Sequence, residues 1–371
     1  MLVVLSGGGT AGHINPALAV AEVLKERGCD VRFAGCPTGV EARLAPQAGL
    51  PFVPFEAAGF NRRHPLSLAG ALAKIQKSTQ AAKRWFAEER PDVVVGFGGY
   101  VSIPVARAAQ SCGVPVVVHE QNSVMGMANK YLARRARTVC VTYAQSAADV
   151  GVQDRVRVTG NPVRASVLAA TREEGRELLG VPEDALMLLV FGGSLGARRI
   201  NEGVAACKED LLAVPGLHVV HITGPRELEN AQQALALAPE EQKRWHVMGY
   251  QDRMGETLAA ADAVVSRSGA TSLAEISARA IPALLVPFPH ATEDHQTKNA
   301  QAYVDAGCAY LLPDDRVATP EFRRLVLSLV QEPDVRARMA QAARGQKTAD
   351  AARILADVVM EAAGRGQHAL Q

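Results

Sequence analysis

The sequence predicts an α/β fold made of two doubly wound domains in tandem. Short β-branched runs alternate with segments of helical length along the 371 residues, a pattern typical of parallel sheets covered by helices on both faces. The first run of each half leads into a glycine-rich turn, SGGGTAG at 6–12 and FGGSLGA at 191–197. The length also favours two domains of ordinary size over one.

The first half contains six predicted strands. A helix is predicted from Pro16 to Arg27, because its apolar residues recur at helical spacing and because Asn15 and Pro16 suit the N-cap and the first helical position. Ligands of open α/β sheets bind at the carboxyl ends of the strands, so we expect functional residues in the loops that follow them. The predicted strands are MLVVLS, DVRFAG, DVVVGFG, PVVVHE, TVCVTY and RVRVTGNPV.

The same cycle restarts after Arg164, with a helix from about Arg199. We therefore expect a first domain at residues 1–163 and a second at 164–346, facing each other across a cleft. The helical stretch 349–362, within a tail at 347–371, is expected to pack back on the first domain. The predicted strands of this half are LMLLVFGG, HVVHITG, WHVMGY, DAVVSRS and PALLVPFP.

The composition is that of an ordinary globular protein, with 48% hydrophobic and 21% charged residues. The formal net charge of +2 gives no reason to expect nucleic acid as a partner. The six cysteines form no C-x-x-C pair, which favours reduced thiols over disulfides or a metal site. No apolar stretch approaches the roughly 20 residues that cross a bilayer.

The first loop carries the spacing Gly7-x-Gly9-x-x-Gly12 of a dinucleotide site. Such a site needs an acidic residue at the end of the second strand, and here none occurs before Glu41, so NAD is disfavoured. The loop could still cradle the phosphates of another ligand. His13 follows at the expected lip of the cleft, either as a packing residue or as a general base that accepts a hydroxyl proton near neutral pH.

Two further glycine loops are candidates for anion or sugar contacts. Gly98, Gly99 and Tyr100 follow the DVVV strand and form either a tight turn with a packed tyrosine or a ligand contact. The loop at 191–201 lacks the Lys-Ser or Lys-Thr pair of a P-loop, yet its N–H groups and the following helix start favour a phosphate, with Ser194 as a hydroxyl donor.

Residues 266–277, SRSGATSLAEIS, give two interpretations. Ser272 and Glu275 have the spacing of a capping box. Alternatively, the small residues Ala270, Thr271 and Ser272 admit a nucleotide at a helix start, and Glu275 accepts its ribose hydroxyls. Downstream, the polar run from residue 290 to 296 suits sugar hydroxyls, and its spacing matches no standard zinc pattern, so we expect no metal.

Read together, seven motifs in order from Gly7 to Ala300 resemble the MurG family. The resemblance implies the GT-B architecture of two Rossmann-like domains around a cleft. It implies inverting transfer of GlcNAc from UDP-GlcNAc to the C4 hydroxyl of the muramoyl sugar of undecaprenyl-linked lipid I, giving lipid II, without a cofactor or a metal. The motifs are GGTAGH, GFGGY, HEQN, NPVR, GGSLGAR, RSGATSLAE and DHQTKNA.

The resemblance also assigns roles to residues. His13 is the expected catalytic base, and Gly98, Gly99 and Tyr100 are expected on the acceptor side. Ala11 stands where relatives often have a third glycine, which is tolerable if its φ is negative. His295 stands where some relatives have a second glutamine. The residues expected to bind UDP-GlcNAc are Thr10, Ala11, Gly12, Asn122, Arg164, Ser194, Gln251, Ala270, Thr271, Ser272, Glu275, His295 and Gln296.

A lipid acceptor requires a surface that meets the membrane. Residues 59–86 mix basic and apolar side chains, which suits peripheral contact with an anionic membrane on its cytoplasmic side, although an ordinary amphipathic helix would look the same. A cell-wall synthesis complex is a further expected partner. The side chains concerned are Arg62, Arg63, Leu66, Leu68, Leu72, Lys74, Ile75, Lys77, Lys83, Arg84, Trp85 and Phe86.

Other functions remain alternatives on the sequence alone. The nearest are another UDP-sugar enzyme of the same fold, such as a natural-product glycosyltransferase or a UDP-GlcNAc 2-epimerase. A UDP-sugar-binding protein without catalysis is an alternative from another class, and an NAD-dependent dehydrogenase comes third.

Overall fold

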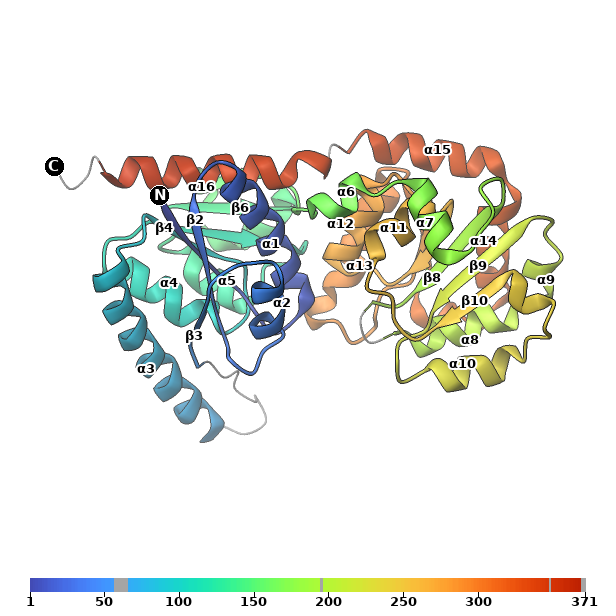
Figure 1. Cartoon of the computed structure of the whole chain (residues 1–371). Helices are drawn as coiled ribbons and strands as arrows, with labels where there is room; N and C mark the ends of the chain where they lie inside the picture. Colours follow the sequence, from blue (N-terminus) through green and yellow to red (C-terminus); the bar gives the residue numbers. More distant parts are fainter. Residues whose placement is uncertain (57–65, 194–195, 347, 368–371) are drawn as a thin grey trace. The chain divides into compact units, whose positions relative to one another are not determined.

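The computed structural model describes residues 1–56, 66–193, 196–346 and 348–367 (Figure 1). The chain divides into two compact units, one formed by Met1–Arg164 with Ala349–Gln371 and the other by Ala165–Thr348. The expected domain ends at residues 163 and 346 lie close to these boundaries. Each unit has its own parallel sheet and its own hydrophobic core, which is the anatomy of a domain.

The sheet of the first unit has seven strands in the order β3-β2-β1-β4-β5-β6-β7, all parallel to their neighbours. β1 is central: its Val4 pairs with Arg32 of β2 on one side and Val94 of β4 on the other. The strands are β1 (Leu2–Ser6), β2 (Asp30–Gly35), β3 (Phe52–Pro54), β4 (Val93–Gly96), β5 (Val116–Glu120), β6 (Thr138–Val141) and β7 (Val156–Val158).

The last helix of the chain completes the first unit. α16 packs against α1 and lies over β4, β5 and β6, as Figure 1 shows for the red helix beside the blue α1. Its Leu355, Ala356 and Val359 are completely buried in one cluster with residues of α1 and β1. The helices of this unit are α1 (Ala11–Glu26), α2 (Glu41–Gln47), α3 (Leu66–Glu89), α4 (Ser102–Ser111), α5 (Met127–Ala133) and α16 (Ala351–Gln367).

The second unit repeats the architecture with a six-stranded parallel sheet in the order β10-β9-β8-β11-β12-β13. Its strands are β8 (Leu186–Phe191), β9 (Leu217–Ile222), β10 (Trp245–Met248), β11 (Ala263–Ser266), β12 (Ala283–Leu285) and β13 (Ala309–Leu311). Both units therefore have the two-faced α/β layering that the sequence predicts.

Local sequence signals explain several helix ends in this unit. The hydroxyl of Thr171 and the carboxylate of Glu174 form a capping box at the start of α7, and Gly180 ends that helix in the left-handed conformation. The helices are α6 (Ala165–Ala169), α7 (Arg172–Leu179), α8 (Arg198–Ala206), α9 (Lys208–Leu212), α10 (Leu228–Leu235), α11 (Met254–Ala260), α12 (Ala270–Ala278), α13 (His295–Asp305), α14 (Pro320–Gln331) and α15 (Pro333–Arg344).

Two expectations about elements are wrong. α1 begins at Ala11 rather than at Pro16, because Thr10 already has the extended backbone of an N-cap and the chain turns into the helix directly after it. Pro16 lies inside the helix. The strands β3 and β13 were not predicted, because runs of three residues at the edges of the sheets are too short to show a pattern.

Candidate active site

The first glycine loop joins β1 to α1 and holds an internal carboxylate. Glu41 is 1% exposed, and its two oxygens accept the N–H groups of Gly9 (3.4 Å) and Cys36 (3.0 Å). A Cβ at Gly8 would lie 2.2 Å from Glu41 Oε1, so this carboxylate packs directly on the loop. A dinucleotide would bring its diphosphate to such a loop, where a negative charge already stands. The NAD hypothesis is therefore disfavoured, and a phosphate cradle for another ligand at this loop stays a prediction.

His13 lies in the first turn of α1, since that helix begins at Ala11. Its ring lies against the backbone of Gly98, where a Cβ would be 3.1 Å from His13 Cε1. Gly98 and Gly99 have φ values of +99° and +80°, which favour glycine. Gly8 N donates to Gly98 O (3.3 Å), and a Cβ at Gly99 would lie 2.4 Å from Gly8 O. The two glycine loops are interlocked through their backbones, and together they position the histidine.

Other predicted ligand contacts of the first unit surround this histidine. Thr10 is the N-cap of α1, and Gly12 lies in its first turn. Ala11 is the first helical residue, so its φ is negative, as the alanine requires. Tyr100, in the loop after β4, is 39% exposed and therefore available to a ligand. Their assignment to substrate stays a prediction.

A buried carboxylate also organises the loop after β5. Glu120 is 1% exposed and accepts hydrogen bonds from Asn122 N (3.0 Å), Gly126 N (3.0 Å) and Asn129 Nδ2 (2.9 Å). The side-chain amide of Asn122 donates to the same carboxylate (3.2 Å). The side chain of Asn122, which is expected to bind UDP-GlcNAc, is thus oriented by a buried carboxylate.

Two residues beside His13 were not expected from the sequence. Gln121 is 1% exposed, and its Oε1 lies 3.0 Å from His13 Nδ1; His119 is completely buried and lies 3.1 Å from Gln121 Nε2. The available signal was the HEQN motif, which follows a predicted strand. The expectation used only Asn122 of this motif and therefore did not include His119 and Gln121.

In the second unit, the capping-box interpretation of Ser272 and Glu275 is wrong. Gly269 is the N-cap of α12, and Ser272 is already inside the helix. Ala270, Thr271 and Ser272 form the first turn, and Glu275 is 8% exposed on the next turn. Small side chains thus surround the N–H groups of this helix start, as the nucleotide interpretation requires.

The start of α13 is tied to the loop that precedes α12. Ser268 Oγ donates to Gln296 O (2.9 Å), and Gln296 Oε1 accepts from Phe288 N (2.9 Å). His295 Nδ1 lies 2.8 Å from Thr292 O, which fixes that ring locally. The structure therefore brings the starts of α12 and α13, with Gln296 and His295, to neighbouring positions at the carboxyl edge of the sheet.

The backbone is strained directly before α13. Glu293 and Asp294 have φ values of +54° and +53°, which residues with side chains adopt only when their surroundings hold them there. Such strain is common in ligand-binding loops.

An arginine cluster in the second unit was also missed. Arg267 donates to Val286 O (3.2 Å) and to Pro287 O (3.0 Å), and it pairs with Asp314 (2.6 Å). Arg199 pairs with the same carboxylate (3.3 Å). Asp314 comes from a distant turn, so no local spacing in the sequence could reveal that it fixes the loop after β12.

Three predicted contacts stand apart from these groups. Arg164 ends the first unit, and its Nε is buried without a hydrogen-bond partner in the described ranges. Gln251, after β10, accepts from Arg253 N (2.9 Å) through its side-chain oxygen. Ser194 lies outside the described residues.

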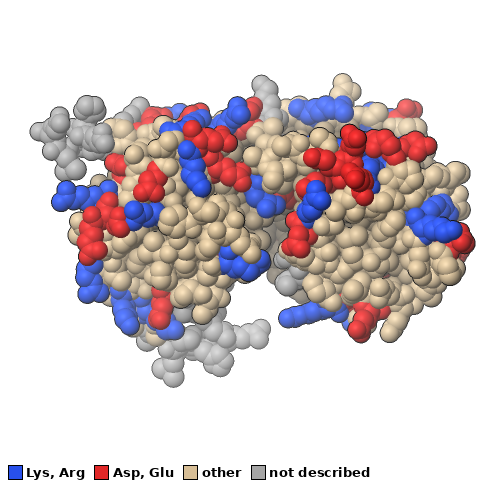
Figure 2. Space-filling view, viewed as in Figure 1, with Lys and Arg blue, Asp and Glu red and all other residues tan. Residues whose placement is uncertain are grey.

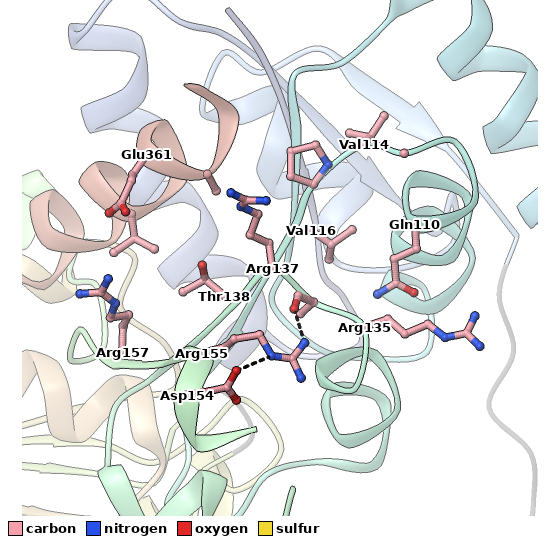
Figure 3. A pocket seen from close by; sticks show the side chains of 15 residues that line it. Gln110, Val114, Val116, Arg135, Arg137, Thr138, Asp154, Arg155, Arg157 and Glu361 are labelled. Carbon is pink, nitrogen blue, oxygen red and sulfur yellow. Dashed lines mark hydrogen bonds and ion pairs between the residues drawn. The ribbon is translucent and has the colours of Figure 1, made fainter. Parts of the chain in front are cut away.

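In the described part of the chain, no group of three His, Cys, Asp or Glu side chains could hold a metal ion. A pocket of about 610 Å³ lies at the amino ends of β5, β6 and β7, the edge of the sheet opposite to His13 (Figure 3). The charged side chains that line it are Arg135, Arg137, Asp154, Arg155, Arg157 and Glu361.

Comparison with known proteins agrees with this arrangement. The N-terminal domain of glycosyltransferase family 28 matches residues 3–141, and the C-terminal domain of that family matches residues 187–355. The crystal structure of Acinetobacter baumannii MurG superposes with a TM-score of 0.76 at 31% identity, covering 97% of this chain and 99% of that one.

Two curated relatives carry the same name, UDP-N-acetylglucosamine--N-acetylmuramyl-(pentapeptide) pyrophosphoryl-undecaprenol N-acetylglucosamine transferase. The relative from Desulfitobacterium hafniense is 39% identical, with 98% of this chain and all of the relative covered. The relative from Carboxydothermus hydrogenoformans is 39% identical, with 92% of each covered.

Two parallel α/β units with glycine loops at their carboxyl edges, matched over their length by glycosyltransferase domains, define a GT-B glycosyltransferase. Fold alone does not fix a substrate, because GT-B folds serve several sugar donors. The chain belongs to glycosyltransferase family 28 and, within it, to the MurG family. The family resemblance drawn from the motifs is confirmed.

Proposed function

We propose that the protein transfers N-acetylglucosamine from UDP-N-acetylglucosamine to N-acetylmuramyl-(pentapeptide) pyrophosphoryl-undecaprenol, the lipid I of peptidoglycan synthesis. The acceptor is the C4 hydroxyl of the muramoyl sugar, and the product is lipid II with an inverted anomeric centre. The observation that carries the proposal is the 39% identity over 98% of the chain to the Desulfitobacterium hafniense transferase of that name.

The second unit binds the donor. Glu275 accepts the ribose hydroxyls beside the small residues Ala270, Thr271 and Ser272, and Gln296 with His295 contacts the sugar. The position of Glu275 supports this role, because it lies on the second turn of α12, directly after the small residues of the first turn. The backbone of Gln251 contacts the uracil.

The diphosphate charge of the leaving group needs stabilisation. Arg164 supplies it, together with the N–H groups that begin α8 and the hydroxyl of Ser194. The buried guanidinium Nε of Arg164, which has no hydrogen-bond partner among the described residues, supports an anionic ligand there.

The first unit presents the acceptor. His13 takes the hydroxyl proton while the oxygen attacks the anomeric carbon and UDP leaves from the opposite face. Gly98, Gly99 and Tyr100 line the acceptor side, and Thr10, Ala11, Gly12 and Asn122 contact the donor sugar. The packing of the His13 ring on Gly98 supports a fixed base rather than a mobile surface histidine.

Turnover of UDP-GlcNAc with a soluble lipid I analogue tests the function. We expect a disaccharide product and UDP in equal amounts, and neither without acceptor. An epimerase would release UDP or N-acetylmannosamine without acceptor, and a binding protein would release nothing. Either of these results would overturn the proposal.

Replacement of His13 by asparagine tests the base. We expect kcat to fall by about 10²- to 10⁴-fold, the usual contribution of general-base catalysis, with little change in the KM for UDP-GlcNAc. His246→Gln, which changes a histidine in β10 of the second unit, serves as the control. A His13→Asn enzyme with near-normal kcat would remove His13 from the mechanism.

Replacement of Glu275 by glutamine tests the donor site. The variant keeps the shape and loses the charge-assisted hydrogen bonds, worth about 1.5–3 kcal/mol, so we expect the dissociation constant for UDP to rise about 10- to 100-fold. Calorimetric titration with UDP measures it, with Glu202→Gln on the exposed side of α8 as the control. Unchanged UDP affinity would contradict the assignment.

We further propose that α3 brings the protein to the cytoplasmic face of an anionic membrane. Leu72 is 56% exposed, Lys74, Lys77 and Arg84 are exposed on the same helix, and Figure 2 shows basic side chains over this helix. The patch is smaller than expected, because Ile75 and Phe86 are buried, 9% and 3% exposed, and Trp85 is half-buried. Arg62, Arg63 and the side chains of Leu66 and Leu68 lie outside the described residues. Within the described ranges, no helix is long and apolar enough to cross a bilayer.

Vesicle sedimentation tests this contact. The triple change of Leu72, Lys74 and Lys77 to serine should weaken binding to phosphatidylglycerol vesicles, because it removes the apolar anchor and two charges worth about 1 kcal/mol each near the surface. The pair Arg137→Ser and Arg157→Ser removes two charges from the pocket in Figure 3 and should leave binding unchanged. Loss of binding in the second variant alone would contradict the proposal. Membership of a cell-wall synthesis complex stays a prediction.

A further inference from the structure

Four groups in the first unit form a chain of hydrogen bonds that ends at His13. His119 Nε2 lies 2.9 Å from Gly160 O, and Gln121 Nε2 lies 3.1 Å from His119 Nδ1. Gln121 Oε1 lies 3.0 Å from His13 Nδ1. The members come from α1, from β5 and its following loop, and from the turn after β7, so tertiary structure alone assembles them.

The orientation of the Gln121 amide follows from its surroundings. Its Nε2 lies 3.0 Å from Phe97 O and 3.2 Å from His119 O. Both partners are carbonyl oxygens, which only accept, so the amide nitrogen and not the amide oxygen faces them. Gln121 is 1% exposed, which leaves no room for water to compensate a reversed amide.

The protonation state of His119 follows in the same way. Burial lowers the pKa of His119 to about 4, so the ring is neutral near pH 7. Its Nε2 faces the carbonyl of Gly160 and therefore carries the single ring proton. Its Nδ1 is then an acceptor, which agrees with donation from Gln121 Nε2.

These constraints leave one arrangement for His13. Gln121 Oε1 can only accept, so His13 Nδ1 carries a proton and donates it to this oxygen. A neutral His13 then has a lone pair on Nε2. We propose that Gln121 and His119 are positioning residues that hold His13 in the Nδ1–H tautomer and keep Nε2 ready to accept a proton.

The inference rests on the proposed function of His13 as a base. With this tautomer, every bond and proton of the transfer step is accounted for. The O–H bond of the acceptor breaks and an N–H bond forms at His13 Nε2, while the oxygen electron pair forms the new bond to the anomeric carbon. The bond from that carbon to UDP breaks, and its electrons leave with UDP. Gln121 Oε1 accepts the hydrogen bond from His13 Nδ1–H throughout and stabilises the imidazolium. The imidazolium later releases the proton on Nε2 to solvent.

The tautomer can be measured without any turnover. Protein labelled with ¹⁵N at histidine gives long-range ¹H–¹⁵N correlations in which the protonated and bare ring nitrogens differ, and the signals missing from His13→Asn assign this residue. At pH 8 we expect His13 to show a protonated Nδ1 and a bare Nε2. A protonated Nε2 in the unmodified protein would overturn the inference.

Gln121→Leu tests the cause. Without its acceptor, His13 should shift toward the Nε2–H tautomer that free histidine prefers, and kcat should fall at least 10-fold at nearly constant KM. His246→Gln, a histidine change in the second unit, should alter neither. An unchanged His13 tautomer in a folded Gln121→Leu protein would contradict the inference.

Gln121→Glu provides a readout that a merely structural role would not give. One oxygen of the new side chain still accepts from His13 Nδ1, so the tautomer is kept. The other oxygen faces Phe97 O and His119 O, where the acid form of the side chain supplies the donor. Gln121→Glu should therefore keep the His13 ring signals that Gln121→Leu changes, and loss of the Nδ1–H pattern in both variants would count against the inference. If His13→Asn keeps activity, the proposed base fails and the tautomer result still stands. If His13 is essential but carries its proton on Nε2, the positioning role of Gln121 and His119 fails and the proposed function stands.

Discussion

At the scale of single residues, the first glycine loop differs from the nucleotide loops that its sequence imitates. Its glycines permit a close approach, but the group that approaches is the carboxylate of Glu41 from the same chain. The loop is thereby fixed before any substrate arrives. This rigidity suits a base that must be held against the neighbouring Gly98 turn.

Gly8→Ala should damage this loop. The added Cβ would lie 2.2 Å from Glu41 Oε1 and 2.9 Å from Val101 Cγ1, so we expect overpacking that lowers the free energy of unfolding by about 1–3 kcal/mol. Urea denaturation followed by fluorescence measures it. Gly70→Ala is the control, because Gly70 is exposed and its Cβ would meet no atom within 4 Å. Equal stability of the two variants would contradict the packing role of Gly8.

Residues that can be predicted from the sequence differ from those that cannot in where their partners lie along the chain. His13, Asn122 and Glu275 stand out in the sequence because their own loops and helix starts are unusual. Gln121 and Asp314 matter through partners far away in the chain, at His13 and at Arg267. Only folding reveals such pairs.

At the scale of elements, the buried strands could be predicted and several boundaries could not. Runs such as VVV at 93–95 and at 116–118 are completely or almost completely buried, so their hydrophobicity is unbroken and easily recognised. The start of α1 depends instead on the backbone conformation of Thr10, and the apparent signal at Pro16 is misleading. The start of α12 at Ala270 shows likewise that spacing alone does not make a capping box.

Leu355→Ala should test the contribution of α16. Leu355 is completely buried in the core of the first unit, and removal of such a side chain costs about 2–5 kcal/mol. Its neighbour Ile354 is 41% exposed, so Ile354→Ala is a matched control that should change the stability little. Urea denaturation compares them. Similar losses for both would mean that α16 does not pack as the structure shows.

At the scale of the whole molecule, the two units repeat one architecture but differ in their chemistry. The first collects His13 and its buried partners at the carboxyl edge of its sheet. The second brings small residues and amides together at the starts of α12 and α13. Family membership connects them to a single transfer reaction.

Stability should fall in acid in both units. Burial lowers the pKa of His119 and of His221 to about 4, below the value of about 6.5 for an unfolded histidine. Between these values the unfolded chain binds more protons, so the free energy of unfolding is highest above pH 6.5 and falls as the pH drops toward 4.

Denaturation at a series of pH values checks this expectation. His221→Gln keeps a donor for Asn201 and should flatten the pH dependence of the second unit. The exposed His290, changed to glutamine, should leave it unaltered. A stability that rises from pH 6.5 to pH 4 would contradict the buried neutral state of these rings.

The position of α16 in the chain has a consequence for folding during translation. The ribosome makes the strands of the first unit early, but α16, the helix that covers β4, β5 and β6, is made only after the whole second unit. An apolar face of the first sheet therefore stays exposed while the second unit is synthesised and folds. Nascent chains of this enzyme should thus bind chaperones at the first unit until α16 has been synthesised.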